Sequence, residues 1–258
     1  MINGNDIPPA LRLRIPSNVK LTYPQQGMTS DVALVDGAGL SVAIKRCSNP
    51  IYVEWLRREH QVLKALADLD LPVPRVLDFA EIEKDGERQV WLIMSKLPGR
   101  SLLASLEATP HNRAELLARL GQLAKRLHGT PVPSALAAES PWIDRMLVQA
   151  EHNLPWCDGS PSLLGDLHQR RPSAVPEVLI HGDLALDNVL VGEDGALSLI
   201  DWSGGGQGDP RWDIALALDT QPDVTLRPDD IAAFENAYGQ TLPDAAIQRW
   251  FLNLYEFF

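Results

Sequence analysis

The stretch VLIHGDLALDNVLVGEDGALSLIDWSG, residues 178–204, holds the residues that decide the fold and the chemistry. It places Asp183, Asn188 and Asp201 beside two apolar runs that are typical of buried strands. Removing a carboxylate from water is costly unless a cation, a proton or a hydrogen-bond donor compensates it. An amide oxygen and one or two carboxylates near each other suit Mg²⁺, and a further carboxylate can orient or deprotonate a hydroxyl. The sequence therefore predicts a charged site at the ends of these strands.

The other acidic residues of this stretch are interpreted as loop residues. Asp187, Glu193 and Asp194 lie in turn-like segments, where such residues need no function. A two-metal phosphoesterase is a rival interpretation, because HGD and GDxxxDN are suggestive fragments of such a site. Sites of that kind usually need several histidines, and His181 is the only one of six in the stretch. The phosphoesterase interpretation is therefore the less favoured one.

The first 97 residues are predicted to form a sheet-rich lobe. Residues 19–45 show short alternating runs broken by turn signals such as DGAG, which predicts an antiparallel sheet. Apolar positions recur at helical intervals over residues 52–70, and residues 88–97 contain a further buried strand. VAIK ends a strand with Lys45, and Glu59 falls on the following helix. In that arrangement a lysine can reach phosphate groups while a glutamate holds it.

Residues 98–258 are predicted to form a larger, mainly helical lobe, with the domain boundary at Pro98-Gly99. Residues 161–176 are predicted to mix a short helix with loop. Amphipathic periodicity predicts helices over 112–130, 141–154, 212–220, 228–239 and 244–258. The chain is therefore divided into 1–97 and 98–258.

Composition excludes several classes of protein. No run approaches the ~18 apolar residues of a membrane helix, and the N-terminus lacks the order of a signal peptide, so we expect a cytoplasmic protein. Two cysteines are too few for a disulfide framework. Residues 1–97 hold 12 acidic and 12 basic residues, which leaves 22 of the 34 acidic and 11 of the 23 basic residues for 98–258. This acidic balance argues against nucleic acid and favours a cationic small-molecule partner.

Taken together, the motifs resemble the protein-kinase-like superfamily, and within it the aminoglycoside phosphotransferases. HGD stands where protein kinases have HRD, and IDW and GDPRWDIA follow it. QGMTSDVALV resembles the phosphate-covering loop of aminoglycoside 3'-phosphotransferases, and YEFF resembles the DEFF or DELF with which those enzymes end. The resemblance implies an α+β, bilobal protein-kinase-like fold with a small N-terminal antiparallel-sheet lobe carrying one helix and a larger helical lobe.

The resemblance also implies a reaction and a role for each motif. The protein is expected to transfer the γ-phosphoryl group of ATP or GTP to a hydroxyl of an aminoglycoside, most favourably the 3'-hydroxyl. It is expected to be a monomer or a weak dimer. Asp183 would be catalytic, and Asn188 and Asp201 would bind Mg²⁺. The nucleotide would contact Lys45, Glu59, Gly27, Met28, Thr29, Ser30, Ser95 and Leu97, and the acceptor would contact Asp158, Asp223, Glu256 and Phe258.

Departures from the family pattern leave the acceptor and the nucleotide open. IDWSGGGQGDP has glycines where the 3'-enzymes commonly carry GR, Leu186 stands where some carry a polar residue, and Ala43 replaces an aromatic residue that often stacks on adenine. A macrolide, a sugar or a small amino alcohol is the alternative acceptor. A catalytically silent nucleotide-binding module is a further alternative, although the chain keeps the full set of charged motif residues.

Overall fold

The computed structural model describes residues 1–12, 15, 19–24, 29–37, 39–84, 86–219 and 224–258. The chain forms two compact units. The first unit is Met1–Pro98 together with Leu199–Gly204, and the second is Gly99–Ser198 together with Gly205–Phe258. The short segment Leu199–Gly204, which a division at residue 98 leaves in the C-terminal part, therefore belongs to the N-terminal unit.

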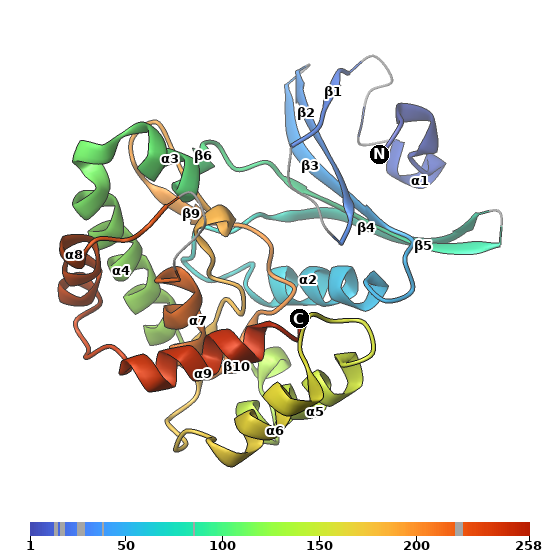
Figure 1. Ribbon diagram of the computed structural model, residues 1–258. Coiled ribbons are helices and arrows are strands. Elements are labelled where there is room, and N and C mark those ends of the chain that lie inside the picture. Colours follow the sequence, from blue (N-terminus) through green and yellow to red (C-terminus); the bar gives the residue numbers. More distant parts are fainter. Residues whose placement is uncertain (13–14, 16–18, 25–28, 38, 85, 220–223) are drawn as a thin grey trace. The chain divides into compact units, whose positions relative to one another are not determined.

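The first unit is built on a five-stranded antiparallel sheet (Figure 1). Its strand order is β1-β2-β3-β5-β4. The strands are β1 (Leu21–Thr22), β2 (Asp31–Gly37), β3 (Leu40–Cys47), β4 (Val76–Lys84) and β5 (Glu87–Ser95). The β2–β3 hairpin turns between a Gly37–Leu40 pair, and Gly39 has a φ of 77°, which a glycine adopts without strain.

The N-terminal segment covers one face of this sheet, a feature that the sequence patterns did not predict. It contains the 3₁₀ turn η1 (Gly4–Asp6) and helix α1 (Pro9–Arg12). Its buried apolar side chains join those of the strands in one core cluster: Ile2, Ile7, Leu11, Ile15, Ala33, Val35, Val42, Ile44, Trp91 and Ile93. Alternate residues of a strand face opposite sides, so helix α2 (Val53–Ala65), which packs on β5, covers residues such as Val90 and Leu92.

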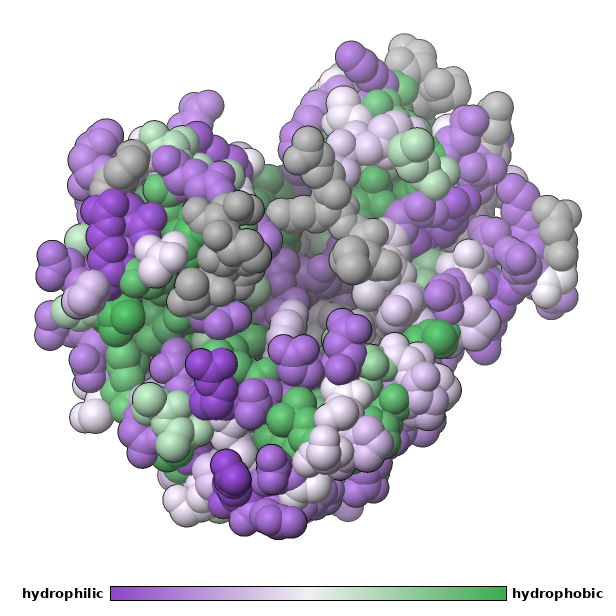
Figure 2. Space-filling model, viewed as in Figure 1, coloured by the Kyte–Doolittle hydropathy of each residue, from purple (hydrophilic) through white to green (hydrophobic). Residues whose placement is uncertain are grey.

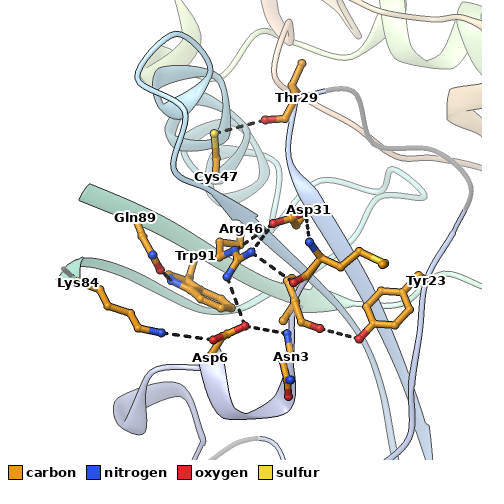
Figure 3. A network of polar contacts seen from close by, with 12 residues as sticks. Asn3, Asp6, Tyr23, Thr29, Asp31, Arg46, Cys47, Lys84, Gln89 and Trp91 are labelled. Atoms are coloured by element: carbon orange, nitrogen blue, oxygen red, sulfur yellow. Dashed lines mark hydrogen bonds and ion pairs between the residues drawn. The ribbon is translucent and has the colours of Figure 1, made fainter. Parts of the chain in front are cut away.

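Polar contacts fasten the same segment at the edge of that core (Figure 3). The Met1 ammonium lies 2.8 Å from Asp31, whose carboxylate also accepts a hydrogen bond from Arg46 Nε at 3.1 Å. Asp6 pairs with Lys84 at 3.3 Å and with Arg46 at 3.6 Å. The guanidinium of Arg46 therefore connects the N-terminal segment to β2 and β3.

The second unit is mainly helical (Figure 1). Its helices are α3 (Leu102–Ala108), α4 (Arg113–Gly129), α5 (Trp142–Asn153), α6 (Pro161–Gln169), α7 (Pro210–Ala217), α8 (Pro228–Tyr238) and α9 (Ala245–Tyr255), with 3₁₀ turns η2 (Pro110–Asn112), η3 (Ser134–Leu136) and η4 (Leu186–Asn188). Helices α4 and α8 pack so closely that a Cβ at Gly121 would lie 2.4 Å from the Phe234 carbonyl oxygen. Glycine at this position therefore permits the approach. Aromatic side chains of α5, α7 and α9 fill a second core, Trp142, Trp212 and Phe251 among them.

Two small sheets support the 178–204 stretch. Strand β7 (Val178–Ile180) pairs with β10 (Gly206–Gly208), whereas β8 (Val189–Val191) lies between β6 (Arg100–Ser101) and β9 (Leu197–Leu199). The glycines of the GGGQG run explain the first pairing: Gly206 has a φ of 145°, and a Cβ at Gly208 would lie 2.3 Å from Ile180 Cδ1. A larger side chain at either position would disturb the β7–β10 pairing, and with it the end of β7 from which the HGD loop starts.

The predicted fold class is confirmed: an antiparallel sheet with a helix precedes a helical C-terminal part. The helices expected over 112–130, 141–154, 228–239 and 244–258 are present as α4, α5, α8 and α9, and α3 and β4 are additions. Within the described residues, every helix is too short or too polar to cross a bilayer. In Figure 2 the surface in view is mostly hydrophilic, with apolar residues scattered between polar ones.

Candidate active site

One charged cluster lies in the first unit and joins β3, α2 and the segment after β9. Lys45 Nζ donates to both carboxylate oxygens of Glu59 at 2.8 Å, and it lies 3.2 Å from Asp201 Oδ1. The side chain of Glu59 is 2% exposed and that of Lys45 12%, whereas Asp201 is 43% exposed. Asp201 therefore faces solvent, whereas the buried Glu59 carboxylate holds the Lys45 ammonium in place.

The charges of this cluster do not balance. Burial opposes the charge of Lys45, but the Asp201 and Glu59 carboxylates outweigh it and raise the lysine pKa, so the ammonium persists at neutral pH. Burial and the nearby Asp201 carboxylate raise the pKa of Glu59, against the effect of Lys45. One cation therefore faces two carboxylates, and this excess of negative charge favours the approach of a further cation.

Loss of the Lys45 ammonium is expected to destabilise the first unit. Lys45→Met leaves the Glu59 carboxylate buried without its partner, which lowers the free energy of unfolding by ~3–5 kcal/mol at neutral pH. Burial already raises the pKa of Glu59, and removal of the Lys45 ammonium raises it further, so the variant buries a neutral carboxyl group in acid and an unpaired carboxylate only as pH rises. The measured loss, from urea unfolding, is therefore smaller in acid than at neutral pH.

Two controls separate this effect from loss of packing. The double variant Lys45→Met/Glu59→Gln removes the isolated charge and is expected to recover most of the stability. Lys64→Met removes an exposed lysine from α2, the helix that carries Glu59, and is expected to change the free energy of unfolding by less than about 0.5 kcal/mol. Equal losses for the single and double variants would show that the ion pair is not the cause.

Asp201 is the one described non-glycine residue with a positive φ, at 65°. Aspartate tolerates this left-handed conformation better than most residues, but it is still uncommon. Nearby anchors hold it: the Leu199 N–H donates to the Pro72 carbonyl at 2.9 Å, and Trp202 Nε1 donates to the Leu199 carbonyl at 3.2 Å. A restrained backbone outlier that carries an exposed carboxylate is typical of a functional residue.

A pocket opens beside the cluster within the first unit. It is lined by Thr29, Ser30, Lys45, Tyr52, Trp55, Leu56, Glu59, Asp201 and Ser203. Thr29 and Ser30 therefore lie with Lys45 as the sequence predicted, whereas Gly27 and Met28 fall outside the described residues. The sequence analysis missed the contribution of Tyr52, Trp55 and Leu56. Their spacing with Glu59 is that of one helical face, which is the signal that could have found them.

Two of the residues predicted to contact the nucleotide lie at the end of β5: Ser95 is its last residue, and Leu97 lies two residues further along. The Ser95 N–H donates to the Arg75 carbonyl at 2.8 Å, and Ser95 Oγ accepts from the Arg75 N–H at 2.8 Å. The N–H of Ser95 is therefore already used within the sheet. A nucleotide contact through the Ser95 N–H would therefore have to replace this hydrogen bond.

A second cluster, in the second unit, is centred on Asp183. Asn188 Nδ2 donates to the Asp183 carbonyl at 2.9 Å and to its Oδ2 at 2.8 Å. The hydroxyl of Tyr255 donates to Oδ1 at 3.0 Å, and the Asp183 N–H donates to His181 Nδ1 at 3.2 Å. His181 thus supports the loop and does not point to a metal site. Tyr255 was not predicted as a site residue.

Asp213 holds this loop from the start of α7. Its Oδ2 accepts from the His181 N–H at 2.7 Å and its Oδ1 from the Gly182 N–H at 2.9 Å. His128 Nε2 lies 3.2 Å from Oδ2, and Tyr238 lies 2.9 Å from His128 Nδ1. The carboxylate is fully buried. Asp213 therefore braces the loop, and His128 and Tyr238, which lie far from it in sequence, extend the network.

The ionisation of Tyr238 gives this network a measurable signature. Burial, together with the Asp213 and Asp209 carboxylates, raises the pKa of Tyr238 from 10.0 to about 12. Its contribution to the free energy of unfolding is therefore present below pH 10.0 and is lost as pH rises toward 12. We expect stability to fall over this window and to fall less in Tyr238→Phe, as measured by urea unfolding. Tyr23→Phe, which removes a phenol of the first unit, is the control, and an unchanged slope in Tyr238→Phe would contradict the assignment.

Three of the four predicted acceptor residues, Asp158, Glu256 and Phe258, lie near the end of α9. The Gly159 N–H donates to the Glu256 carbonyl at 3.0 Å, which brings the exposed side chains of Asp158 and Glu256 into one region. The ring centroid of Phe258 lies 5.9 Å from that of Trp212. Asp223 lies outside the described residues.

The donor set around these clusters fits Mg²⁺ better than a softer metal. Within the described parts of the chain, His, Cys, Asp and Glu side chains form no group of three or more suited to a metal ion. Asn188 uses its amide N–H groups on Asp183, so its Oδ1 is the atom directed toward other partners. Amide and carboxylate oxygens with few histidines are the ligands that Mg²⁺ takes alongside phosphate and water.

The family model described as "Phosphotransferase enzyme family" matches residues 20–247, which include the first cluster and, in the second, Asp183 and Asn188 but not Tyr255. The chain belongs to this phosphotransferase family. The resemblance drawn from the HGD, IDW and GDPRWDIA motifs is thereby confirmed. Curated relatives are aminoglycoside 3'-phosphotransferases. That of Streptomyces fradiae is 27% identical over 80% of this chain and 77% of its own length, and that of Escherichia coli is 25% identical over 73% and 71%.

Solved structures of the family share the fold. The aminoglycoside phosphotransferase APH(4)-Ia superposes with a TM-score of 0.69 at 18% identity, covering 98% of this chain and 89% of its own. The GDP and kanamycin complex of APH(2")-IIia gives 0.65 at 20% identity, covering 95% and 86%. At these identities the likeness concerns the phosphotransferase fold and leaves the acceptor open.

Proposed function

We propose that the chain transfers the γ-phosphoryl group of ATP or GTP to a hydroxyl of an aminoglycoside, with the 3'-hydroxyl as the first candidate. The observation that carries the proposal is the Lys45–Glu59–Asp201 cluster. Because the chain belongs to a phosphotransferase family, we interpret this cluster as the site that binds the nucleotide. The names of the Streptomyces fradiae and Escherichia coli relatives support the aminoglycoside and the 3' position.

On the nucleotide side, Lys45 binds the α- and β-phosphates, and Glu59 holds its ammonium in place. Backbone N–H groups of the 27–30 segment, which includes Gly27, Met28, Thr29 and Ser30, cover the phosphates. Asn188 and Asp201 are the residues that would hold Mg²⁺, and the ion would supply charge neutralisation for the transferred phosphoryl group. The excess negative charge beside Lys45 supports this assignment.

On the acceptor side, Asp183 accepts the hydrogen bond of the acceptor hydroxyl and takes its proton during transfer. The transition state of phosphoryl transfer is loose, so positioning and charge neutralisation contribute more than strong base catalysis. Asp158, Asp223, Glu256 and Phe258 contact the acceptor. The acidic excess of residues 98–258 attracts a polycationic substrate.

A macrolide, a sugar or an amino alcohol remains the second candidate acceptor. The observation that favours it is Tyr255. Its phenol contacts the Asp183 carboxylate, and it stands where the DEFF ending of the 3'-enzymes begins with an acidic residue. A bulky phenol in place of a carboxylate reduces the negative charge available to an ammonium group. The nucleotide-binding reading of the first unit is unaffected by this choice.

A coupled assay of nucleoside diphosphate release decides between these acceptors. Purified protein is incubated with Mg²⁺ and ATP or GTP in the presence of kanamycin, neomycin, a macrolide, choline or homoserine. We expect acceptor-dependent release with kanamycin or neomycin. Release with another acceptor alone would contradict the aminoglycoside assignment, and no release with any of them would favour a silent nucleotide-binding module.

A further inference from the structure

Both carboxylate oxygens of Asp183 accept hydrogen bonds within the second unit. Asn188 Nδ2 donates to Oδ2 at 2.8 Å, and the Tyr255 hydroxyl donates to Oδ1 at 3.0 Å. Asn188 belongs to the same loop as Asp183, whereas Tyr255 is the last residue of α9 and lies 72 residues after Asp183 in the chain. Tertiary packing, and not the loop itself, therefore places a phenol on this carboxylate.

The residues that follow Tyr255 are held in place by two hydrogen bonds, the first of which is buried. Asn153 Nδ2 donates to the Phe257 carbonyl at 2.8 Å, and the Gly159 N–H donates to the Glu256 carbonyl at 3.0 Å. A Cβ at Gly159 would lie 2.4 Å from the Phe257 ring, so the fit of this turn depends on the glycine. The end of α9 is thus a fixed mount for the Tyr255 side chain.

The phenol itself is positioned but accessible. Its ring centroid lies 5.6 Å from that of Trp212, whose Nε1 donates to the Gly182 carbonyl at 2.7 Å. Tyr255 is 37% exposed, in contrast to Trp212, which is buried. A ligand arriving from solvent can therefore displace the phenol from Asp183 without opening the core.

The Tyr255 hydroxyl offers Asp183 the same interaction that an acceptor must offer, an O–H donor on a carboxylate oxygen. We propose that Tyr255 is a positioning residue that holds the place of the acceptor hydroxyl on Asp183 Oδ1 and keeps water from that place until the acceptor displaces it. The inference rests on the proposed function, because it assumes that Asp183 serves phosphoryl transfer. It assigns the phenol a role in the choice between acceptor and water.

The reaction that Tyr255 suppresses is hydrolysis of the bound nucleotide. In that reaction a water oxygen forms a bond to the γ-phosphorus, and the bond from that phosphorus to the β–γ bridging oxygen breaks. The water proton passes to Asp183 and then to solvent, and the products are a nucleoside diphosphate and inorganic phosphate. A water on Oδ1 would be oriented for this attack, as an acceptor hydroxyl is for transfer.

The test is nucleotide hydrolysis without any acceptor, measured as phosphate release in the presence of Mg²⁺ and ATP or GTP. Tyr255→Phe keeps the ring and frees Oδ1, so we expect hydrolysis to rise about tenfold, the change that corresponds to ~1.4 kcal/mol for one hydrogen bond. Adding Asp183→Asn is expected to abolish the increase. Tyr23→Phe, which removes a phenol bonded to the Ile2 carbonyl in the first unit, is the matched control and should leave hydrolysis unchanged.

Steady-state kinetics with an acceptor distinguish place-holding from simple support of Asp183. If the phenol competes with the acceptor, Tyr255→Phe lowers the acceptor KM and leaves kcat nearly unchanged. A lower kcat with unchanged KM, or unchanged hydrolysis in an enzyme that phosphorylates an acceptor, would overturn the inference while the proposed function stands. No nucleotide turnover by the wild type with or without acceptors would overturn both.

A ligand-free readout tests the contact on which the inference depends. Tyr255→Phe is expected to lower the Tm of the wild type, and to lower it by much less in the Asp183→Ala background, where the carboxylate is gone. Equal shifts in the two backgrounds would show that the phenol and the carboxylate do not interact, which would overturn the place-holding role. This measurement requires no substrate and therefore separates the contact from the reaction.

Discussion

Asparagine in place of Asp183 is expected to lower kcat for phosphoryl transfer by about 10²–10⁴-fold. The amide keeps the size of the side chain. Its oxygen can accept the hydrogen bond from Asn188, and its NH₂ group can donate to the Tyr255 hydroxyl oxygen, so the loop should keep its conformation. What it loses is the negative charge that orients the acceptor hydroxyl and takes its proton. Steady-state kinetics give kcat, and calorimetric titration of the nucleotide should show binding within a few-fold of the wild type.

Asp187→Asn is the matched control for this variant. Asp187 lies in η4 of the same loop, is half-buried, and is interpreted as a loop residue without a chemical role. It should keep most of the activity. Equal losses from the two substitutions would point to a general disturbance of the loop, and full activity of Asp183→Asn would remove Asp183 from the mechanism.

Asp213→Ala is expected to have the largest effect on stability. It leaves the buried N–H of His181 and the half-buried N–H of Gly182 without their acceptor, and it removes one buried partner of His128, which keeps Tyr238. Loss of a buried charged partner of this kind typically costs ~3–5 kcal/mol. Urea unfolding, followed by tryptophan fluorescence, measures the change. Activity should fall as well, because the loop that carries Asp183 loses its anchor.

A surface aspartate provides the comparison. Asp229 is exposed in the first turn of α8, and Asp229→Ala is expected to change stability by about 0.5 kcal/mol or less. Asp213→Asn, which keeps one acceptor oxygen, should fall between the two alanine variants. A loss at Asp213 no larger than that at Asp229 would show that the buried network does not hold the loop.

Local sequence signals were sufficient for the elements that carry Lys45 and Glu59. Strand β3 and helix α2 have clear periodicity, and the lysine and glutamate fall on the faces that bring them within 2.8 Å. The antiparallel sheet and the main helices of the second unit were predictable for the same reason, since each buries one apolar face. The glycines after IDW were noted as a departure, and the close β7–β10 pairing now gives them a structural role.

Contacts between distant segments were not predictable from local pattern. The Tyr255–Asp183 contact spans 72 residues, and those of His128 with Asp213 and Tyr238 span 85 and 110. Each depends on how helices pack, which periodicity does not specify. The N-terminal segment escaped prediction because its few apolar residues, such as Ile2 and Ile7, complete a core supplied by the strands and show no regular period of their own.

The central claim is that this chain moves a phosphoryl group to an acceptor hydroxyl with the help of Asp183. Mass spectrometry of kanamycin or neomycin after incubation with Mg²⁺, ATP or GTP and the protein tests it directly. We expect a mass gain of one phosphoryl group with the wild type and none within the same time with Asp183→Asn. An unmodified acceptor with the wild type, or equal phosphorylation by the two proteins, would contradict it.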